Sequence, residues 1–212
     1  FDGDALMLCN PNNPTGQIIS REMLEEILTI CERRKMFLFI DECFLDLTDG
    51  GDCLTMKPYL QTHQNLFLLK AFTKSYGMAG LRLGYCLCGN APLLRTMGQT
   101  VQPWNVSVPA QKAGVAALKQ TAFLEKAKQT IREQRAALTG GLRELGLRVI
   151  GSHTNYILFY SDRELREPLL EKGIQIRSCA NYPGLEAGWY RIAVKLPREN
   201  ETLLAALKEI LR

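Results

Sequence analysis

The sequence has no long hydrophobic run and no strong excess of charge. Its longest apolar runs, such as Met36 to Ile40, are far shorter than the ~20 residues that a membrane-spanning helix needs. The net charge of +4 is modest, and the lysines and arginines are dispersed along the chain. A nucleic-acid surface would instead concentrate them. We therefore expect a soluble protein that binds neither a membrane nor nucleic acid.

The sequence also lacks the cysteine pattern of a secreted protein or of a metal site. Its seven cysteines are an odd number and are scattered, and the chain does not open on a signal peptide, so we expect reduced thiols in the cytoplasm. Cys86 and Cys88 lie one residue apart on a predicted strand, without a second Cys or His cluster. They are better interpreted as a pair of small buried side chains than as metal ligands, and we expect no metal.

Length and composition predict a globular protein. With 212 residues, 46% hydrophobic and 23% charged, the chain can form one large or two small domains. It begins with Phe1 in place of Met and enters a predicted strand at Ala5. We expect it to be a fragment of a longer protein.

Hydrophobic periodicity predicts two kinds of domain. Buried strands are expected at 5–9, 36–40, 66–69 and 84–88, and helices at 91–100, 109–118 and 122–145. A second series of short strands is expected at 147–150, 156–160, 174–177 and 190–194, with helices at 162–172 and 199–211. The pattern predicts an α/β fold: a mostly parallel sheet with helices in residues 1–130, then a small α+β domain in 131–212.

The segment Lys70 to Tyr85, KAFTKSYGMAGLRLGY, carries the strongest chemical signal. Lys74 follows a predicted buried strand, and three glycines allow the backbone to turn tightly around it. A lysine whose pKa is lowered by its surroundings can form a Schiff base with a carbonyl. Arg82 is a fixed cation suited to a phosphate. An aldehyde and a phosphate together indicate pyridoxal 5'-phosphate (PLP).

Two further polar segments follow predicted strands. Asn10 to Gly16, NPNNPTG, follows the first strand and could be a turn alone. Asp41 lies at the carboxyl end of the strand from Met36, where open α/β sheets place ligand groups. A carboxylate there can pair with the pyridinium nitrogen of PLP, although a lone Asp can also cap the next turn.

These three segments, in this order, resemble the class I/II aminotransferase family of PLP enzymes. The resemblance covers essentially the whole chain and implies a homodimer. It implies cofactor contacts from five residues: Asn13, Asp41, Thr73, Lys74 and Arg82. Lys74 is implied as the catalytic residue, and Asn13 as the partner of the cofactor's ring oxygen. The chain departs from the family at Phe44, where many members have Tyr, and at Ala71, where Ser or Thr is usual.

Two arginines of the second predicted domain lie between apolar residues. Burying Arg177 or Arg191 without an anion would be unfavourable, so we expect each to meet an acidic group. Internal salt bridges, for example with Glu186 or Glu164, are one possibility. A bidentate clamp on a substrate carboxylate is the other. The resemblance implies this second role for Arg191, with Asn155 helping to hold the same group.

The C-terminal part resembles one branch of the family, the L-threonine O-3-phosphate decarboxylases of cobalamin biosynthesis. Ile176 to Leu185, IRSCANYPGL, is the most specific part of this match, and Trp104 in PWNV is a contact candidate. A phosphorylated amino acid is the expected substrate. Transamination of histidinol phosphate or a related amino acid is the alternative reaction. A non-catalytic sensor or binding module of the same fold is a third possibility.

Overall fold

The computed structural model describes residues 3–212, which form two compact units. The first contains residues 3–11 and Ile18–Glu125, and the second contains Asn12–Gln17 and Lys126–Arg212. The long helix α6 (Thr121–Glu144) contains both this division and the domain boundary expected at residue 130. The assignment of Asn12–Gln17 to the second unit was not expected from the sequence.

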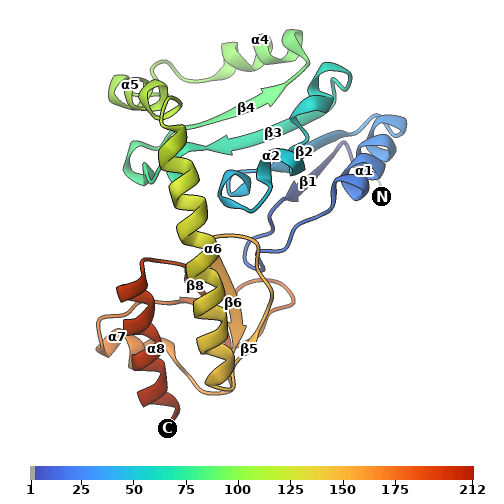
Figure 1. Cartoon of the computed structure of the whole chain (residues 1–212). Helices are drawn as coiled ribbons and strands as arrows, with labels where there is room; N and C mark the ends of the chain where they lie inside the picture. The colour runs from blue at the N-terminus through green and yellow to red at the C-terminus, as the bar shows by residue number, and fades with distance from the viewer. Residues whose placement is uncertain (1–2) are drawn as a thin grey trace. The chain divides into compact units, whose positions relative to one another are not determined.

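The first unit is built on a four-stranded sheet (Figure 1). Its strands lie in chain order: β1 (Ala5–Cys9), β2 (Phe37–Asp41), β3 (Leu66–Ala71) and β4 (Gly84–Cys88). The first three strands are parallel, and β4 pairs antiparallel with β3. Together with the helices between the strands, this arrangement confirms the predicted α/β class. The carboxyl ends of β2 and β3 therefore lie at the same edge of the sheet.

Helix α1 (Arg21–Arg33) forms because its apolar residues recur on one face, which packs into the first core. The Ser20 hydroxyl caps it by accepting a hydrogen bond from the Met23 amide at 3.3 Å. The core joins Leu24 and Leu28 of α1 to buried side chains of β2 and β3. The other helical segments of this unit are η1 (Leu45–Leu47), α2 (Gly51–Leu54), η2 (Lys57–Gln61), α3 (Phe72–Ser75), η3 (Ala79–Leu81), α4 (Ala91–Thr100) and α5 (Val108–Ala117).

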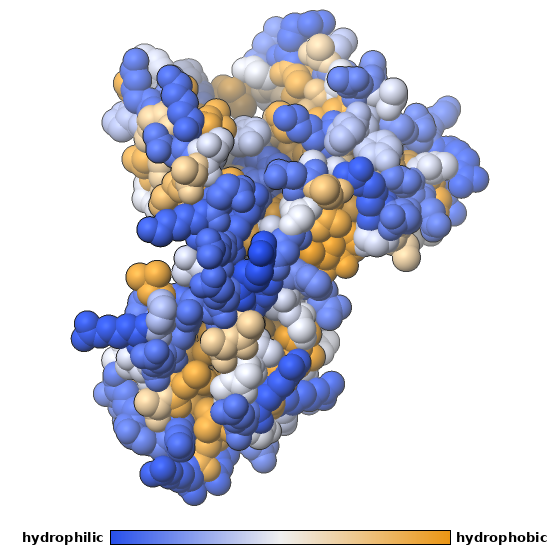
Figure 2. Space-filling model, in the orientation of Figure 1, coloured by the Kyte–Doolittle hydropathy of each residue, from blue (hydrophilic) through white to orange (hydrophobic). Residues whose placement is uncertain are grey.

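Several large hydrophobic side chains are exposed on α4, on α5 and in the loop between them. Trp104 in this loop is 96% exposed, and Val101 and Val108 on either side of it are also exposed. Figure 2 shows hydrophobic residues among hydrophilic ones on the visible face. Among the described residues Trp104 therefore has few neighbours, and its suggested role as a ligand contact stays a prediction.

The second unit is an antiparallel sheet with helices. Its strands are β5 (Arg148–Val149), β6 (Tyr156–Tyr160), β7 (Arg177–Ser178) and β8 (Trp189–Ala193), in the order β5-β6-β8-β7. Its remaining helices are α7 (Arg166–Glu171) and α8 (Pro197–Leu211). Leu138 and Leu142 of α6 and Leu207 of α8 pack on Ile157 and Phe159 of β6. This is the expected small α+β arrangement.

Most boundaries differ from those expected by one or two residues, and the starts of α7 and β7 differ by more. Helix α7 begins at Arg166, later than the predicted Asp162, because the Glu164 carboxylate accepts hydrogen bonds from the amides of Arg166 and Glu167 and caps the helix there. Strand β7 begins at Arg177, where the sequence predicted an end, because the Ile174 amide still bonds to the Leu169 carbonyl at the end of α7. No helix within residues 3–212 is long and apolar enough to cross a membrane.

Candidate active site

Two of the predicted residues follow the carboxyl ends of neighbouring strands in the first unit. Asp41 is the last residue of β2, and its Oδ1 accepts a hydrogen bond from the Cys43 amide at 2.9 Å. Lys74 lies in α3, directly after β3, and its side chain is exposed. Its Nζ lies 5.6 Å from the centroid of the Phe44 ring. Within residues 3–212, Lys74 makes no ion pair, so no carboxylate occupies its amine.

The thiol of Cys43 experiences the charges of both Asp41 and Lys74. Burial raises the pKa of this thiol, and the hydrogen bond and negative charge of Asp41 raise it further, to about 12, although Lys74 acts in the opposite direction. The two predicted residues therefore lie close enough to influence one side chain. The same balance keeps Cys43 protonated and unreactive near neutral pH.

The two predicted phosphate ligands lie on either side of Lys74 in the chain. Thr73 is half-buried in α3. Arg82 is exposed and adopts the left-handed backbone region, with φ 53°, which is uncommon for a residue other than glycine. Its Nη1 donates to the Ala79 carbonyl at 3.0 Å. This is the one hydrogen bond of the guanidinium among the described residues, so several donors remain available for an anion.

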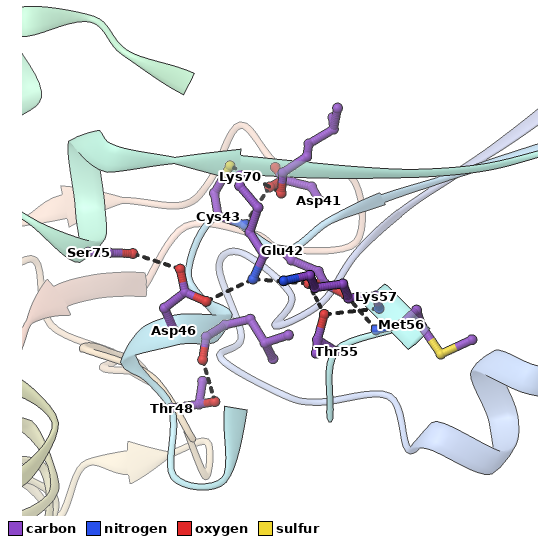
Figure 3. Close-up of polar contacts among 12 residues, drawn as sticks. Asp41, Glu42, Cys43, Asp46, Thr48, Thr55, Met56, Lys57, Lys70 and Ser75 are labelled. Atoms are coloured by element: carbon purple, nitrogen blue, oxygen red, sulfur yellow. Dashed lines mark hydrogen bonds and ion pairs between the residues drawn. The ribbon is translucent and has the colours of Figure 1, made fainter. Parts of the chain in front are cut away.

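A buried group of charges beneath these residues was missed by the sequence analysis (Figure 3). Lys70 of β3 lies between Glu42 and Asp46, with Nζ to oxygen distances of 3.1 Å and 2.8 Å. Its side chain is 9% exposed and that of Glu42 is 1% exposed. The signal was present, because Lys70 and Glu42 are charged residues at the ends of predicted buried strands.

Asn13 lies in a loop of the second unit that is fixed by residues far away in the sequence. The Tyr156 hydroxyl donates to the Asn12 carbonyl at 2.9 Å, and the His153 amide donates to the Gly16 carbonyl at 2.9 Å. Gly16 has φ 72°, and a Cβ there would lie 2.1 Å from the Ser152 Oγ. Glycine is therefore required at this position by both conformation and space.

Arg191 of β8 reaches the same loop. Its Nη1 donates to Oδ1 of Asn13, and its guanidinium carbon lies 5.4 Å from the centroid of the Tyr156 ring. The structure thus joins two residues that the sequence predicted separately, 178 positions apart. Tyr156 was predicted only as part of a strand. The sequence analysis missed its contacts with the loop of Asn13 and with the Arg191 guanidinium.

Arg177 of β7 pairs directly with Arg191 of β8 in the antiparallel register. Side chains at such paired positions lie on the same face of the sheet, and like charges placed this way repel each other. Arg177 is exposed, so it needs no buried anion, and it donates to Asn181 Oδ1 at 3.1 Å. Neither arginine forms an ion pair with Glu164 or Glu186 among the described residues.

Asn155 precedes β6 in the second unit. Its Oδ1 is buried and has no hydrogen-bond partner within residues 3–212. A buried polar atom without a partner is unfavourable and calls for an explanation. Because the two ends of an amide side chain are assigned from their hydrogen bonds, this group can present either a donor or an acceptor to a ligand.

The comparisons with known proteins identify the family. The family model for aminotransferase class I and II matches residues 2–207. Threonine-phosphate decarboxylase of Salmonella typhimurium is 37% identical over 99% of this chain and 58% of its own length. Histidinol-phosphate aminotransferase of Caldanaerobacter subterraneus is 34% identical over 97% of this chain and 57% of its own length. Histidinol-phosphate aminotransferase of Clostridium acetobutylicum has a similar structure, with TM-score 0.93 and 30% identity over 98% of this chain and 64% of that one.

The chain belongs to the class I/II aminotransferase family, whose members depend on PLP. It spans about 58% of the length of the curated relatives that it matches. Its residues fit the cofactor chemically. Lys74 offers an amine that has no acidic partner in residues 3–212, Asp41 a carboxylate at a strand end, and Arg82 guanidinium donors available for a phosphate.

Proposed function

We propose that the protein is a PLP-dependent enzyme that decarboxylates L-threonine O-3-phosphate to (R)-1-amino-2-propanol O-phosphate in cobalamin biosynthesis. The observation that carries the PLP assignment is Lys74, an amine directly after β3 with no carboxylate partner among the described residues, whose charge acts on Cys43 together with that of Asp41. The choice of decarboxylation is supported by the 37% identity to the Salmonella decarboxylase.

We assign the cofactor contacts to five residues, on the family resemblance and on the chemistry of each side chain. When bound, PLP supplies an electron sink for the bond that breaks at the substrate α-carbon. Asp41 would hold a proton on the pyridine nitrogen, and Asn13 would donate to the ring oxygen. Thr73 and Arg82 would bind the phosphate. Lys74 would hold the cofactor covalently and move a proton at the substrate α-carbon.

We assign the substrate carboxylate to Arg191, Arg177 and Asn155. The two arginines are paired across β7 and β8, and the described part of the chain gives neither an acidic partner, so an anion bound there would relieve their repulsion. Arg191 already has its orientation fixed by Asn13 and Tyr156. Positioning of this carboxylate decides which α-carbon bond breaks, and it therefore decides between release of carbon dioxide and removal of a proton.

Borohydride reduction tests the role of Lys74. We expect the protein to show a visible absorption band with PLP, and reduction to fix the cofactor to Lys74, as located by peptide mass spectrometry. Lys74→Ala should lose the adduct after dialysis, whereas Lys172→Ala, a change at an exposed lysine, should keep it. A reduced adduct retained in Lys74→Ala would show that another amine holds the cofactor.

Product analysis tests the reaction. The full-length protein, incubated with L-threonine O-3-phosphate and no keto acid, should release carbon dioxide over many turnovers. An aminotransferase would stop after one turnover, because the amino group would remain on the cofactor. In a parallel incubation with histidinol phosphate and 2-oxoglutarate we expect no glutamate. Glutamate in the second mixture and no carbon dioxide in the first would contradict the decarboxylase assignment.

Transamination is the second candidate, and specific similarities favour it. A histidinol-phosphate aminotransferase is 34% identical to this chain, and another has TM-score 0.93. The same lysine, aspartate and arginines would serve that reaction. Arg191→Ala should lower turnover in whichever mixture reacts, so full activity of this variant in both would contradict the carboxylate assignment.

A further inference from the structure

Four side chains form a connected polar group in the interior of the first unit, here called the Lys70 network: Glu42, Asp46, Lys70 and Ser75. The Lys70 ammonium bridges the carboxylates of Glu42 and Asp46. The Ser75 hydroxyl then donates to Asp46 Oδ2 at 3.2 Å. Figure 3 shows this path from Glu42 through Lys70 and Asp46 to Ser75. It connects the end of β2, the η1 segment, β3 and α3.

The Glu42 end of the Lys70 network is fully satisfied. Glu42 Oε2 accepts from the Thr55 hydroxyl at 2.7 Å, and Oε1 accepts from the Met56 amide at 2.9 Å. Burial alone would lower the pKa of Lys70, but the charges of Glu42 and Asp46 outweigh it and raise the pKa. Lys70 is therefore a cation at neutral pH.

A buried ion pair of this kind contributes little net stability, because the desolvation of its charges offsets their attraction. What it does supply is a fixed geometry, since all partners must be in place at once. Two members of the Lys70 network are chain neighbours of the proposed cofactor residues. Glu42 directly follows Asp41, and Ser75 directly follows Lys74.

In each pair, the two neighbours differ in exposure. Glu42 is fully buried and Asp41 is half-buried, while Ser75 is 3% exposed and Lys74 is exposed. The inner residue of each pair belongs to the Lys70 network, and the outer residue carries the proposed cofactor chemistry. A single set of contacts therefore fixes the backbone at both outer residues.

We propose that the Lys70 network is a positioning device that couples the placement of Asp41 to that of Lys74. The Lys70 ammonium holds Glu42 and Asp46 together, and Asp46 holds α3 through Ser75. Loss of either end displaces the other. The inference rests on the proposed function in one respect, namely that Asp41 and Lys74 are the residues that hold the cofactor.

Ser75→Ala breaks the link to α3 with the smallest possible change. If the Lys70 network couples the two ends, hydrogen exchange should accelerate roughly 10-fold at two places, a size typical of the loss of one buried hydrogen bond. One is α3, through the Tyr76 and Gly77 amides, and the other is η1, through the Leu45 and Leu47 amides. Acceleration in α3 alone would overturn the coupling.

Ser161→Ala is the matched control, because Ser161 is also 3% exposed and its hydroxyl bonds to Arg163 in the second unit. It should leave exchange in α3 and η1 unchanged. Lys70→Met is the most direct variant, but it leaves two carboxylates without their cation and can prevent folding. Asp46→Ala and Asp46→Glu replace it, since the Asp46 side chain is 31% exposed and leaves room for a longer acid.

The second readout is the dissociation constant of PLP. Each of Ser75→Ala and Asp46→Ala removes a hydrogen bond that involves a charged group. Such a loss typically changes an equilibrium constant between about 10-fold and 10²-fold, so we expect PLP binding to weaken by that amount. Asp46→Glu should restore most of the affinity, which a purely structural loss would not predict. Unchanged PLP affinity in Ser75→Ala, with exchange accelerated at both places, would overturn the positioning role.

The two readouts separate this inference from the proposed function. If the wild-type protein binds no PLP and borohydride leaves Lys74 unmodified, the proposed function is wrong. Hydrogen exchange in the same protein still decides the coupling: joint acceleration in α3 and η1 supports it, and acceleration in only one of them refutes it.

Discussion

Lys70 and Lys74 are four residues apart in the chain, and their surroundings give them different chemistry. Lys70 is buried between two carboxylates, which keep its ammonium charged. Lys74 is exposed and contacts the Phe44 ring, without an acid among the described residues. Because no described carboxylate holds its amine in an ion pair, Lys74 is better suited than Lys70 to react with a carbonyl. The sequence predicted this role for Lys74 from its motif, but it gave no role to Lys70.

Asp41→Asn removes the carboxylate while keeping the size of the side chain. If Asp41 keeps the pyridine nitrogen of PLP protonated, turnover should fall at least ~10²-fold, because an unprotonated ring is a poor electron sink. PLP affinity should fall as well. Titration measures the PLP affinity, and steady-state kinetics measure the turnover. Asp162→Asn, a change at an exposed aspartate of the second unit, is the control. Turnover near that of the wild type would show that Asp41 is structural.

Cys43 should make the stability of the protein depend on alkaline pH. Its folded-state pKa is raised from 9.0 to about 12, so the unfolded chain loses this proton first as the pH rises. The contribution of Cys43 to the unfolding free energy is complete below pH 9 and decreases as the pH approaches 12. Between pH 9 and 10.5 the unfolding free energy of Cys43→Ala should therefore fall less steeply than that of the wild type. Urea titrations measure this slope, and Cys53→Ala, at an exposed cysteine, should keep the wild-type slope.

At the scale of elements, periodicity predicted the strands and long helices well because each has a clear apolar face or run. Strands β1, β4 and β6 have the predicted bounds, and α4 begins and ends where expected. The failures occur where side-chain contacts decide a boundary, as at the Glu164 cap of α7. The contact of Arg191 with Asn13 could not be predicted either, because it depends on how the loop at Gly16 packs against Ser152.

The start of α1 offers a test of how much one side-chain cap stabilises a helix. Ser20→Ala removes the acceptor for the Met23 amide, which should lower the unfolding free energy by ~1 kcal/mol. Ser20→Asp should retain stability, because its carboxylate can accept the same hydrogen bond. Chemical denaturation of the three proteins gives the comparison. Equal stability of Ser20→Ala and the wild type would mean that water satisfies this amide equally well.

At the scale of the whole molecule, the described chain contains two separate hydrophobic cores. One joins α1 to β2 and β3, and the other joins α6 and α8 to the sheet of the second unit. The proposed cofactor residues Asp41 and Lys74 belong to the first unit, and the proposed carboxylate ligands Arg177 and Arg191 to the second. The expected homodimer and cytoplasmic location stay predictions.

Matched substitutions in the two cores test whether each unit is stabilised by its own interior. Leu28 in α1 is 1% exposed and Leu142 in α6 is fully buried, so truncation of either to Ala should lower the unfolding free energy of its own unit by ~2–5 kcal/mol. Hydrogen exchange followed by mass spectrometry should then show faster exchange in β2 and β3 for Leu28→Ala, and in β6 and β8 for Leu142→Ala. Each variant serves as the control for the other, since the change in side-chain volume is identical. If either substitution accelerates exchange equally in both sheets, the two cores unfold together. Destabilising either core would then also abolish the proposed enzymatic activity.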